Sequence, residues 1–233
     1  MPIETLDYAP AALKMEITNQ VEADWRMHAC AKEPWTVAFI EAIPPGCAFV
    51  DVGANVGSYT LVAAARGLRV LAIEPSYTSA HAIGHNLALN DLLDHAEVIQ
   101  GAAGAFDGWE WLHLQDLRPG AASHQLGGGP RKRFFHRLRV PVYTLDGLLE
   151  RWAPGCPVYL KVDVDGNEEG VFAGAPKSLA PGGTLAGIMV EMGANNEAAL
   201  TATLVAAGWR LDRRFHERDG KDIGIAYGEF VRA

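Results

Sequence analysis

Three acidic side chains lie where their carboxylates could do chemistry together. Asp51, Glu74 and Asp163 each lie at or near the carboxyl end of a short, apolar, β-prone run. Because the ligand crevice of an open α/β sheet lies outside the carboxyl ends of its strands, these side chains are expected to face one crevice. There a carboxylate can hold a cationic group, accept hydrogen bonds from ligand hydroxyls or take up a proton.

The first of these runs is followed by a tight glycine turn, GANVG at residues 53–57, and then by small and apolar residues with helical spacing. Gly53 lets a ligand approach the backbone, Asn55 tolerates a left-handed turn, and Gly57 lets the helix begin close to the strand. The pattern lacks the third glycine of the NAD type, and Asp51 would repel a pyrophosphate. The turn therefore favours a ligand with an amine or sulfonium group.

Glu74 lies about 20 residues after the turn, where an acid commonly accepts hydrogen bonds from both ribose hydroxyls. Further along, Lys161, Asp163 and Asp165 share one side of the predicted strand 158–164, provided that the strand extends that far. Ionisable groups on a buried strand are costly without partners, which favours a functional site over a solvated strand end.

These residues require an α/β sheet to position them. Strands are predicted at 48–52, 69–74, 96–100, 158–164 and 185–191, with a final antiparallel pair at 209–213 and 222–230. Helical patterns lie between them, and two more, 17–27 and 35–43, precede the first strand. The chain of 233 residues suits one compact unit, in which 1–47 form a helical cap and 48–233 the main domain.

An insertion is expected at about 104–143. Residues 109–114 and 137–143 alternate apolar and polar side chains, which predicts two strands that pair with each other. The loop between them carries a cluster of cations in an otherwise acidic protein: Arg131, Lys132, Arg133 and Arg137. Either this is a solvated loop, or it is a lid that attracts an anionic acceptor.

The net charge of −8 argues against a nucleic-acid partner. No apolar run approaches membrane-spanning length, so no membrane partner is expected either. Cys30, Cys47 and Cys156 are an odd number without metal-ligand spacing, and they indicate reduced thiols in a cytoplasmic protein. The oligomeric state is left open.

Two motifs together resemble the FkbM-type class I S-adenosylmethionine-dependent methyltransferases. The first is the glycine turn with its flanking acids, and the second is the run LKVDVDGNEEGVFAGA at residues 160–175, preceded by Thr144-Leu145-Asp146. The resemblance covers about 49–191. It departs from the family pattern at two positions, since the family usually has Glu at Asp165 and often His at Asn167.

The resemblance implies a Rossmann-like seven-stranded sheet with helices on both faces, and S-adenosylmethionine as cofactor. Small residues after the strand 96–100 would leave room for adenine, and the cap could bring Tyr8, Glu33 or Trp35 to the pocket. The expected cofactor-binding residues are Asp51, Gly53, Ala54, Asn55, Gly57, Tyr59, Thr60, Glu74, Pro75, Gln100, Ala102 and Asp163.

The implied reaction is O-methylation of a hydroxyl on a small molecule, such as a sugar or a secondary metabolite. An alcohol is a poor nucleophile at neutral pH and needs a base or a metal. Asp163 is the first candidate base, with Lys161 setting its charge and His136 as a further candidate. Alternatively, Asp163, Asp165 and Glu191 could share Mg²⁺ or Ca²⁺.

Two other classes remain open. The chain could be a non-catalytic S-adenosylmethionine-binding protein, although the presence of Asp163 argues against it. It could also be a nucleotide-sugar or NAD-dependent oxidoreductase, which Asp51 and the missing third glycine oppose.

Overall fold

A computed structural model describes residues 2–128, 135–153, 155–218 and 221–233. Its centre is a seven-stranded sheet with the strand order β12-β13-β11-β10-β3-β4-β5. The strands are β3 (Ala48–Val52), β4 (Arg69–Glu74), β5 (Ala96–Gln100), β10 (Val158–Val162), β11 (Leu185–Gly193), β12 (Trp209–Arg218) and β13 (Lys221–Arg232). All pairings from β5 to β11 are parallel, whereas β13 runs antiparallel to β11 and β12.

The chain order along the sheet reverses between β3 and β10, which is where ligands bind in open α/β folds. The first three strands have the predicted bounds. The fourth is shorter than predicted: β10 ends at Val162, so Asp163 and Asp165 lie in the loop that follows. Asp165 adopts a left-handed φ of 56°, which is incompatible with a continuing strand.

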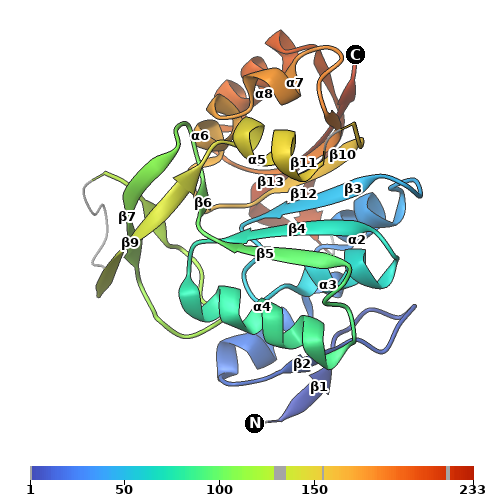
Figure 1. Ribbon diagram of the computed structural model, residues 1–233, viewed down its shortest axis with the longest axis vertical. Coiled ribbons are helices and arrows are strands. Elements are labelled where there is room, and N and C mark those ends of the chain that lie inside the picture. The colour runs from blue at the N-terminus through green and yellow to red at the C-terminus, as the bar shows by residue number, and fades with distance from the viewer. Residues whose placement is uncertain (1, 129–134, 154, 219–220) are drawn as a thin grey trace.

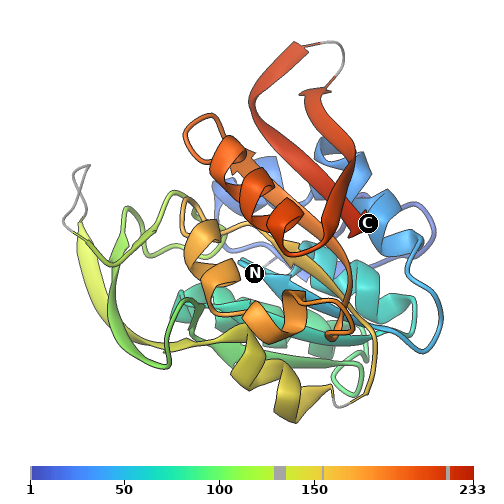
Figure 2. The same cartoon turned by 90° about the horizontal axis from the view of Figure 1, so that it is seen from above.

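Helices cover both faces of the sheet, as expected (Figures 1 and 2). On one face lie α2 (Pro34–Glu41), α3 (Ser58–Ala65) and α4 (Tyr77–Leu89), and on the other α5 (Leu145–Trp152), α6 (Glu168–Ala173), α7 (Pro176–Leu179) and α8 (Glu197–Ala206). Each face buries its own apolar cluster against the sheet. Burying both faces explains why the central strands are continuous apolar runs rather than alternating ones.

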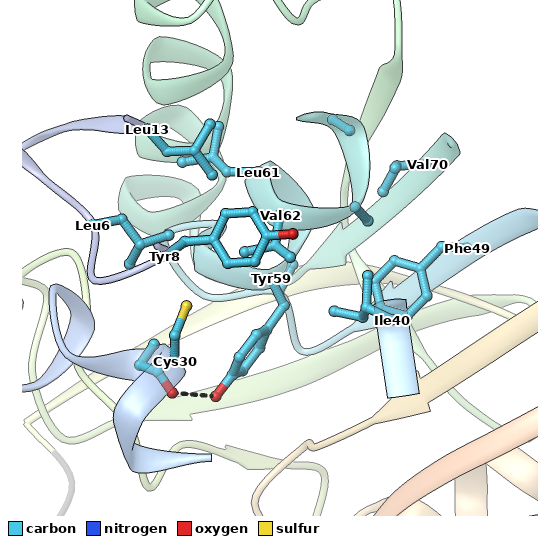
Figure 3. Packing of buried hydrophobic residues seen from close by; sticks show 14 of the residues in the cluster. Leu6, Tyr8, Leu13, Cys30, Ile40, Phe49, Tyr59, Leu61, Val62 and Val70 are labelled. Carbon is cyan, nitrogen blue, oxygen red and sulfur yellow. Dashed lines mark hydrogen bonds between the residues drawn. The ribbon is translucent and has the colours of Figure 1, made fainter. Parts of the chain in front are cut away.

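The N-terminal segment contains two helices close to the predicted positions, η1 (Glu22–Arg26, a π-helix) and α2, with the short α1 (Ala29–Lys32) between them. It also forms an antiparallel ribbon, β1 (Ile3–Thr5) with β2 (Lys14–Glu16), that the sequence did not predict. Figure 3 shows Leu6, Tyr8 and Leu13 packing on α3. The N-terminal segment is therefore part of the apolar core on the face of the sheet that α2, α3 and α4 cover.

The insertion forms a separate four-stranded sheet with the order β6-β9-β7-β8, and its main pairing, β7 with β9, confirms the two predicted strands. The strands are β6 (Ala102–Ala103), β7 (Gly108–Leu114), β8 (Gln125–Leu126) and β9 (His136–Tyr143). Arg137 stacks on Trp111 at 4.6 Å. Arg131, Lys132 and Arg133 lie outside the described residues. Among the described helices, none is long and apolar enough to span a membrane.

Candidate active site

A cavity of about 240 Å³ opens at the carboxyl ends of the central strands, under the inserted sheet and the N-terminal segment. Six of the residues predicted to bind the cofactor line it: Gly53, Asn55, Glu74, Pro75, Ala102 and Asp163. Asp165 and Glu191 line it as well. The fold therefore brings together residues at or near the carboxyl ends of five neighbouring strands, β11, β10, β3, β4 and β5, as an open α/β sheet does at its switch point.

Glu74 is buried at the end of β4, and the backbone fixes both of its carboxylate oxygens. Its Oε2 accepts from the amide of Asn55 at 2.9 Å, and its Oε1 accepts from the amide of Ser76 at 2.8 Å. Burial raises the pKa of Glu74 to about 7, although both amide hydrogen bonds act in the opposite direction. Each oxygen keeps further capacity to accept hydrogen bonds, so the side chain can receive a pair of hydroxyl groups.

The glycine turn packs directly against the backbone at the end of β10. A β-carbon on Gly53 would lie 1.8 Å from the carbonyl oxygen of Asp163, and the φ of Gly53 is +79°. The amide of Asp163 donates to the carbonyl of Val52 at 3.0 Å. Glycine is therefore required at position 53 by contact with the protein's own backbone, and this contact fixes the first loop relative to Asp163.

Asp51 is completely buried within β3, beside Lys161 on the neighbouring strand β10. The ammonium of Lys161 lies 3.3 Å from Oδ1 of Asp51 and 3.5 Å from Oδ2 of Asp163. Thr60 donates its hydroxyl to Oδ2 of Asp51 at 2.8 Å. The cationic group next to Asp51 is thus a side chain of this protein, and a contact between Asp51 and the cofactor remains a prediction.

Asp163 and Glu191 form a hydrogen-bonded pair of carboxyl groups in the cavity wall. Burial alone would raise the pKa of Asp163, but the charge of Lys161 and the hydrogen bond from Glu191 hold it below its usual range. The charge of Asp163, together with burial, raises the pKa of Glu191 well above its usual value. At neutral pH the pair therefore holds one proton, with Asp163 ionised and Glu191 donating to it.

Asp165 is placed differently from its two acidic neighbours. Its Oδ2 accepts from the backbone amide of His124 at 3.2 Å. Burial and the charge of Asp163 raise the pKa of Asp165 to about 6. Within the described residues, no group of three or more His, Cys, Asp or Glu side chains has the arrangement of a metal site.

The other predicted residues do not line the main cavity. Ala54, Tyr59 and Lys161 line an adjoining recess of about 30 Å³. Gly57 lies against Ile83 of α4, Thr60 is bound to Asp51, and Gln100 is exposed at the end of β5. His136 is exposed on β9 and lines a separate surface depression with residues 115–119. The structure therefore does not place His136 in the cavity that holds Glu74 and Asp163.

Sequence reasoning missed three cavity residues of high chemical interest: Arg26, Lys32 and His124. Neither ring nitrogen of His124 has a hydrogen-bond partner among the described residues, and burial lowers the pKa of the imidazole. His124 is therefore a neutral base at the cavity wall near pH 7. All three residues come from irregular or short segments, where neither periodicity nor a motif marks a functional position.

The fold is that of the class I methyltransferases. The magnesium protoporphyrin IX methyltransferase of Synechocystis PCC 6803, solved with bound S-adenosylmethionine, superposes with a TM-score of 0.53 at 18% identity, covering 94% of this chain and 86% of that chain. A precorrin-6y C5,15-methyltransferase from Geobacter metallireducens GS-15 gives 0.53 at 10% identity, covering 93% of each chain. These likenesses establish the fold.

A solved methyltransferase FkbM from Methylobacillus flagellatus KT gives a TM-score of 0.52 at 18% identity. That match covers 78% of this chain and 43% of that chain, so this chain spans less than half of its length. The family model of the methyltransferase FkbM domain matches residues 51–204, which is more than half of the chain. The chain therefore belongs to the FkbM methyltransferase family. No curated protein sequence matched it.

Proposed function

We propose that this protein transfers the methyl group of S-adenosylmethionine to a hydroxyl of a small molecule. The observation that carries the proposal is that one cavity contains two acidic side chains in different environments. Glu74 presents a backbone-fixed carboxylate, and Asp163 is kept ionised by Lys161. The first suits a ribose diol, and the second suits a group from which a proton must be taken.

The residues that line the cavity suit the chemical groups of S-adenosylmethionine. Glu74 can accept from both ribose hydroxyls, and the small residues 101–103 leave space for a flat ring beside backbone. Asn55 lines the same cavity, and its buried Oδ1 has no hydrogen-bond partner among the described residues. A buried acceptor without a partner is costly, which supports a ligand donor at this place. When bound, S-adenosylmethionine supplies an electrophilic methyl group on a sulfonium.

A polar groove of about 810 Å³ adjoins the cavity and supports the assignment of an acceptor side. Cavity and groove share Leu126 and four polar residues, His124, Asp165, Asn167 and Glu191. Further amide side chains of the groove, Gln125 among them, can donate to and accept from hydroxyl groups. An acceptor in the groove would therefore meet the cofactor at the carboxyl pair.

In the proposed reaction, Asp163 would take the proton of the attacking hydroxyl as the new oxygen–carbon bond forms and the methyl–sulfur bond of the cofactor breaks, with S-adenosylhomocysteine as the leaving group. Lys161 and the hydrogen bond from Glu191 keep Asp163 ionised at neutral pH, so that it can accept a proton, although both also lower its basicity. His124 can accept a hydrogen bond from the acceptor, because its imidazole is neutral. A general base of this kind contributes about 10²- to 10⁴-fold to the rate.

Calorimetric titration with S-adenosylhomocysteine tests the cofactor assignment. Glu74→Gln should weaken binding about tenfold or more, because each charge-assisted hydrogen bond contributes about 1.5–3 kcal/mol. The control is Glu97→Gln, since Glu97 pairs with Arg69 at the exposed sheet edge, away from the cavity. A wild-type protein that does not bind this product at high micromolar concentration contradicts the proposal.

Turnover with a panel of hydroxyl-bearing small molecules tests the reaction. Asp163→Asn should lower kcat by about 10²-fold or more, the contribution of a general base. Tight binding of S-adenosylhomocysteine without turnover of any acceptor would instead favour a non-catalytic cofactor-binding protein.

A further inference from the structure

The cavity continues past Gly53 into a small recess beneath the N-terminal segment. Cavity and recess share five lining residues, which are Arg26, Lys32, Gly53, Asn55 and Asp163. Glu33 and Tyr59 line the recess only. At about 30 Å³, the recess has room for a small polar group rather than for a ring.

The order of the strands determines which end of the cofactor reaches this recess, an argument that rests on the proposed function. The sheet runs β5, β4, β3, β10 across the cavity floor. Residues 101–103 follow β5, Glu74 ends β4, and Gly53 follows β3. A cofactor with its base over β5 and its ribose on Glu74 therefore extends its amino-acid end past Gly53 toward the recess.

The carboxylate of that amino acid would lie close to two acidic side chains. Asp163 is ionised, and the buried Glu33 lies in the recess wall. Lys161 lies between two carboxylates, since its ammonium is 3.3 Å from Asp51 and 3.5 Å from Asp163. Arg26 and Lys32 are the other Lys and Arg side chains in the described lining of cavity and recess. A buried carboxylate needs such a cation.

Arg26 is held in position before any ligand binds. Its Nε and Nη2 donate to the carbonyl of Gly120 at 2.9 and 2.7 Å, and its own carbonyl accepts from the hydroxyl of Ser58 at 3.1 Å. Lys32 lies 3.0 Å from Glu33. A side chain that is already ordered loses less conformational entropy when it binds a ligand. The charges of Lys32 and Arg26 also lower the pKa of Asp163, so their field reaches the recess.

We propose that Arg26 and Lys32 bind the carboxylate of the cofactor's methionine moiety. Both residues precede residues 51–204, the part of the chain that matches the family domain. The N-terminal segment would then select for a cofactor with an intact amino-acid end, in addition to covering the sheet.

A pair of ligands separates this role from a general effect on the pocket. S-adenosylhomocysteine has the amino-acid end, whereas 5′-methylthioadenosine has the same base, ribose and thioether without it. Calorimetry would compare both ligands on the wild type, Arg26→Gln and Lys32→Met. Arg118→Gln is the matched control, because Arg118 is exposed, pairs with Asp116 and does not line the cavity. Arg26→Lys keeps the charge but loses the forked contact with Gly120.

The expected result is a loss of about tenfold or more in affinity for S-adenosylhomocysteine in Arg26→Gln and Lys32→Met, with 5′-methylthioadenosine changed less than about twofold. Arg26→Lys should recover most of the loss. The inference is overturned if both ligands weaken equally, or if neither does. If the wild type binds neither ligand, the proposed function itself fails.

Discussion

Replacing Lys161 by methionine should destabilise the protein strongly, and the effect should depend on pH. Lys161 is 2% exposed, and it contacts the fully buried Asp51 and the partly exposed Asp163. Methionine fills nearly the same volume, so the change removes a charge more than it removes packing. It leaves two neighbouring carboxylates without their shared cation.

Removing one partner of a buried ion pair typically costs about 3–5 kcal/mol. The lower end of this range, about 3 kcal/mol, is expected here because water and Glu191 partly compensate Asp163. Lysine depresses the pKa of Asp163 in the folded protein, so its contribution is present above the unfolded pKa and is lost as pH falls through the folded value. The difference in unfolding free energy between variant and wild type should therefore stay constant from pH 8 to pH 5 and narrow below about pH 4, as pH falls toward the folded pKa of about 2.

Urea unfolding at pH 8, pH 5 and about pH 3 measures this difference, and Asp51→Asn with the double variant completes a double-mutant cycle. An asparagine at position 51 can still accept the hydrogen bond from the Thr60 hydroxyl. In the double variant it also removes the buried negative charge of Asp51, which Lys161→Met alone leaves without its cation. The double variant should recover about 1–2 kcal/mol relative to Lys161→Met alone, which is within the usual range of coupling energies. A single variant within about 1 kcal/mol of the wild type at pH 8 would refute the reasoning, given the cost expected of a buried pair. So would a double variant that is no more stable than the single one.

Two further predictions concern the cofactor loop. Affinity for S-adenosylhomocysteine should rise from pH 6 to pH 8, because ribose hydroxyls donate more strongly to the ionised form of Glu74, whose pKa is about 7. Calorimetry on Glu74→Gln should show an affinity that does not change with pH over this range. A wild-type affinity that is equally independent of pH would contradict the assignment. Gly53→Ala should cost far more stability than Gly67→Ala in urea unfolding. Both glycines have positive φ, at +79° and +76°, but only at Gly53 would the new β-carbon meet a backbone atom, so equal costs would show that the clash relaxes.

Much of the fold could be predicted from the sequence, because local and global signals agree there. Strands β3 and β4 are apolar runs that end in or next to acids, and the glycine turn between β3 and α3 is confirmed by φ values of +79° at Gly53 and +89° at Gly57. Burial on both faces makes such strands easy to recognise. The position of Glu74 in the cavity followed from the same reasoning.

Other features depend on contacts that a sequence pattern does not contain. The ribbon β1–β2 has three residues per strand and is held by Asn86 of α4 and by Asn90, which directly follows that helix. Their side-chain oxygens accept from backbone amides at 3.0 and 2.8 Å. His124 reaches the cavity because a segment of the insertion folds over the strand ends. Such positions are set by tertiary contacts, which override local propensity.

The cavity wall is assembled from segments that lie far apart in the sequence, and this has a consequence for folding. Trp35 of the N-terminal segment stacks on Phe215, with ring centroids 5.6 Å apart, and lies at a tilt of 45° against Tyr227 at 5.4 Å. Tyr227 lines the cavity together with Arg26. Such contacts close long loops, so they are expected to form late and slowly. Partly folded chains would then lack a cofactor site. A ligand that is present at 100 times its Kd and binds only the fully folded state raises the free energy of unfolding by about 2.7 kcal/mol. The supply of cofactor would thus influence how long a folded molecule persists.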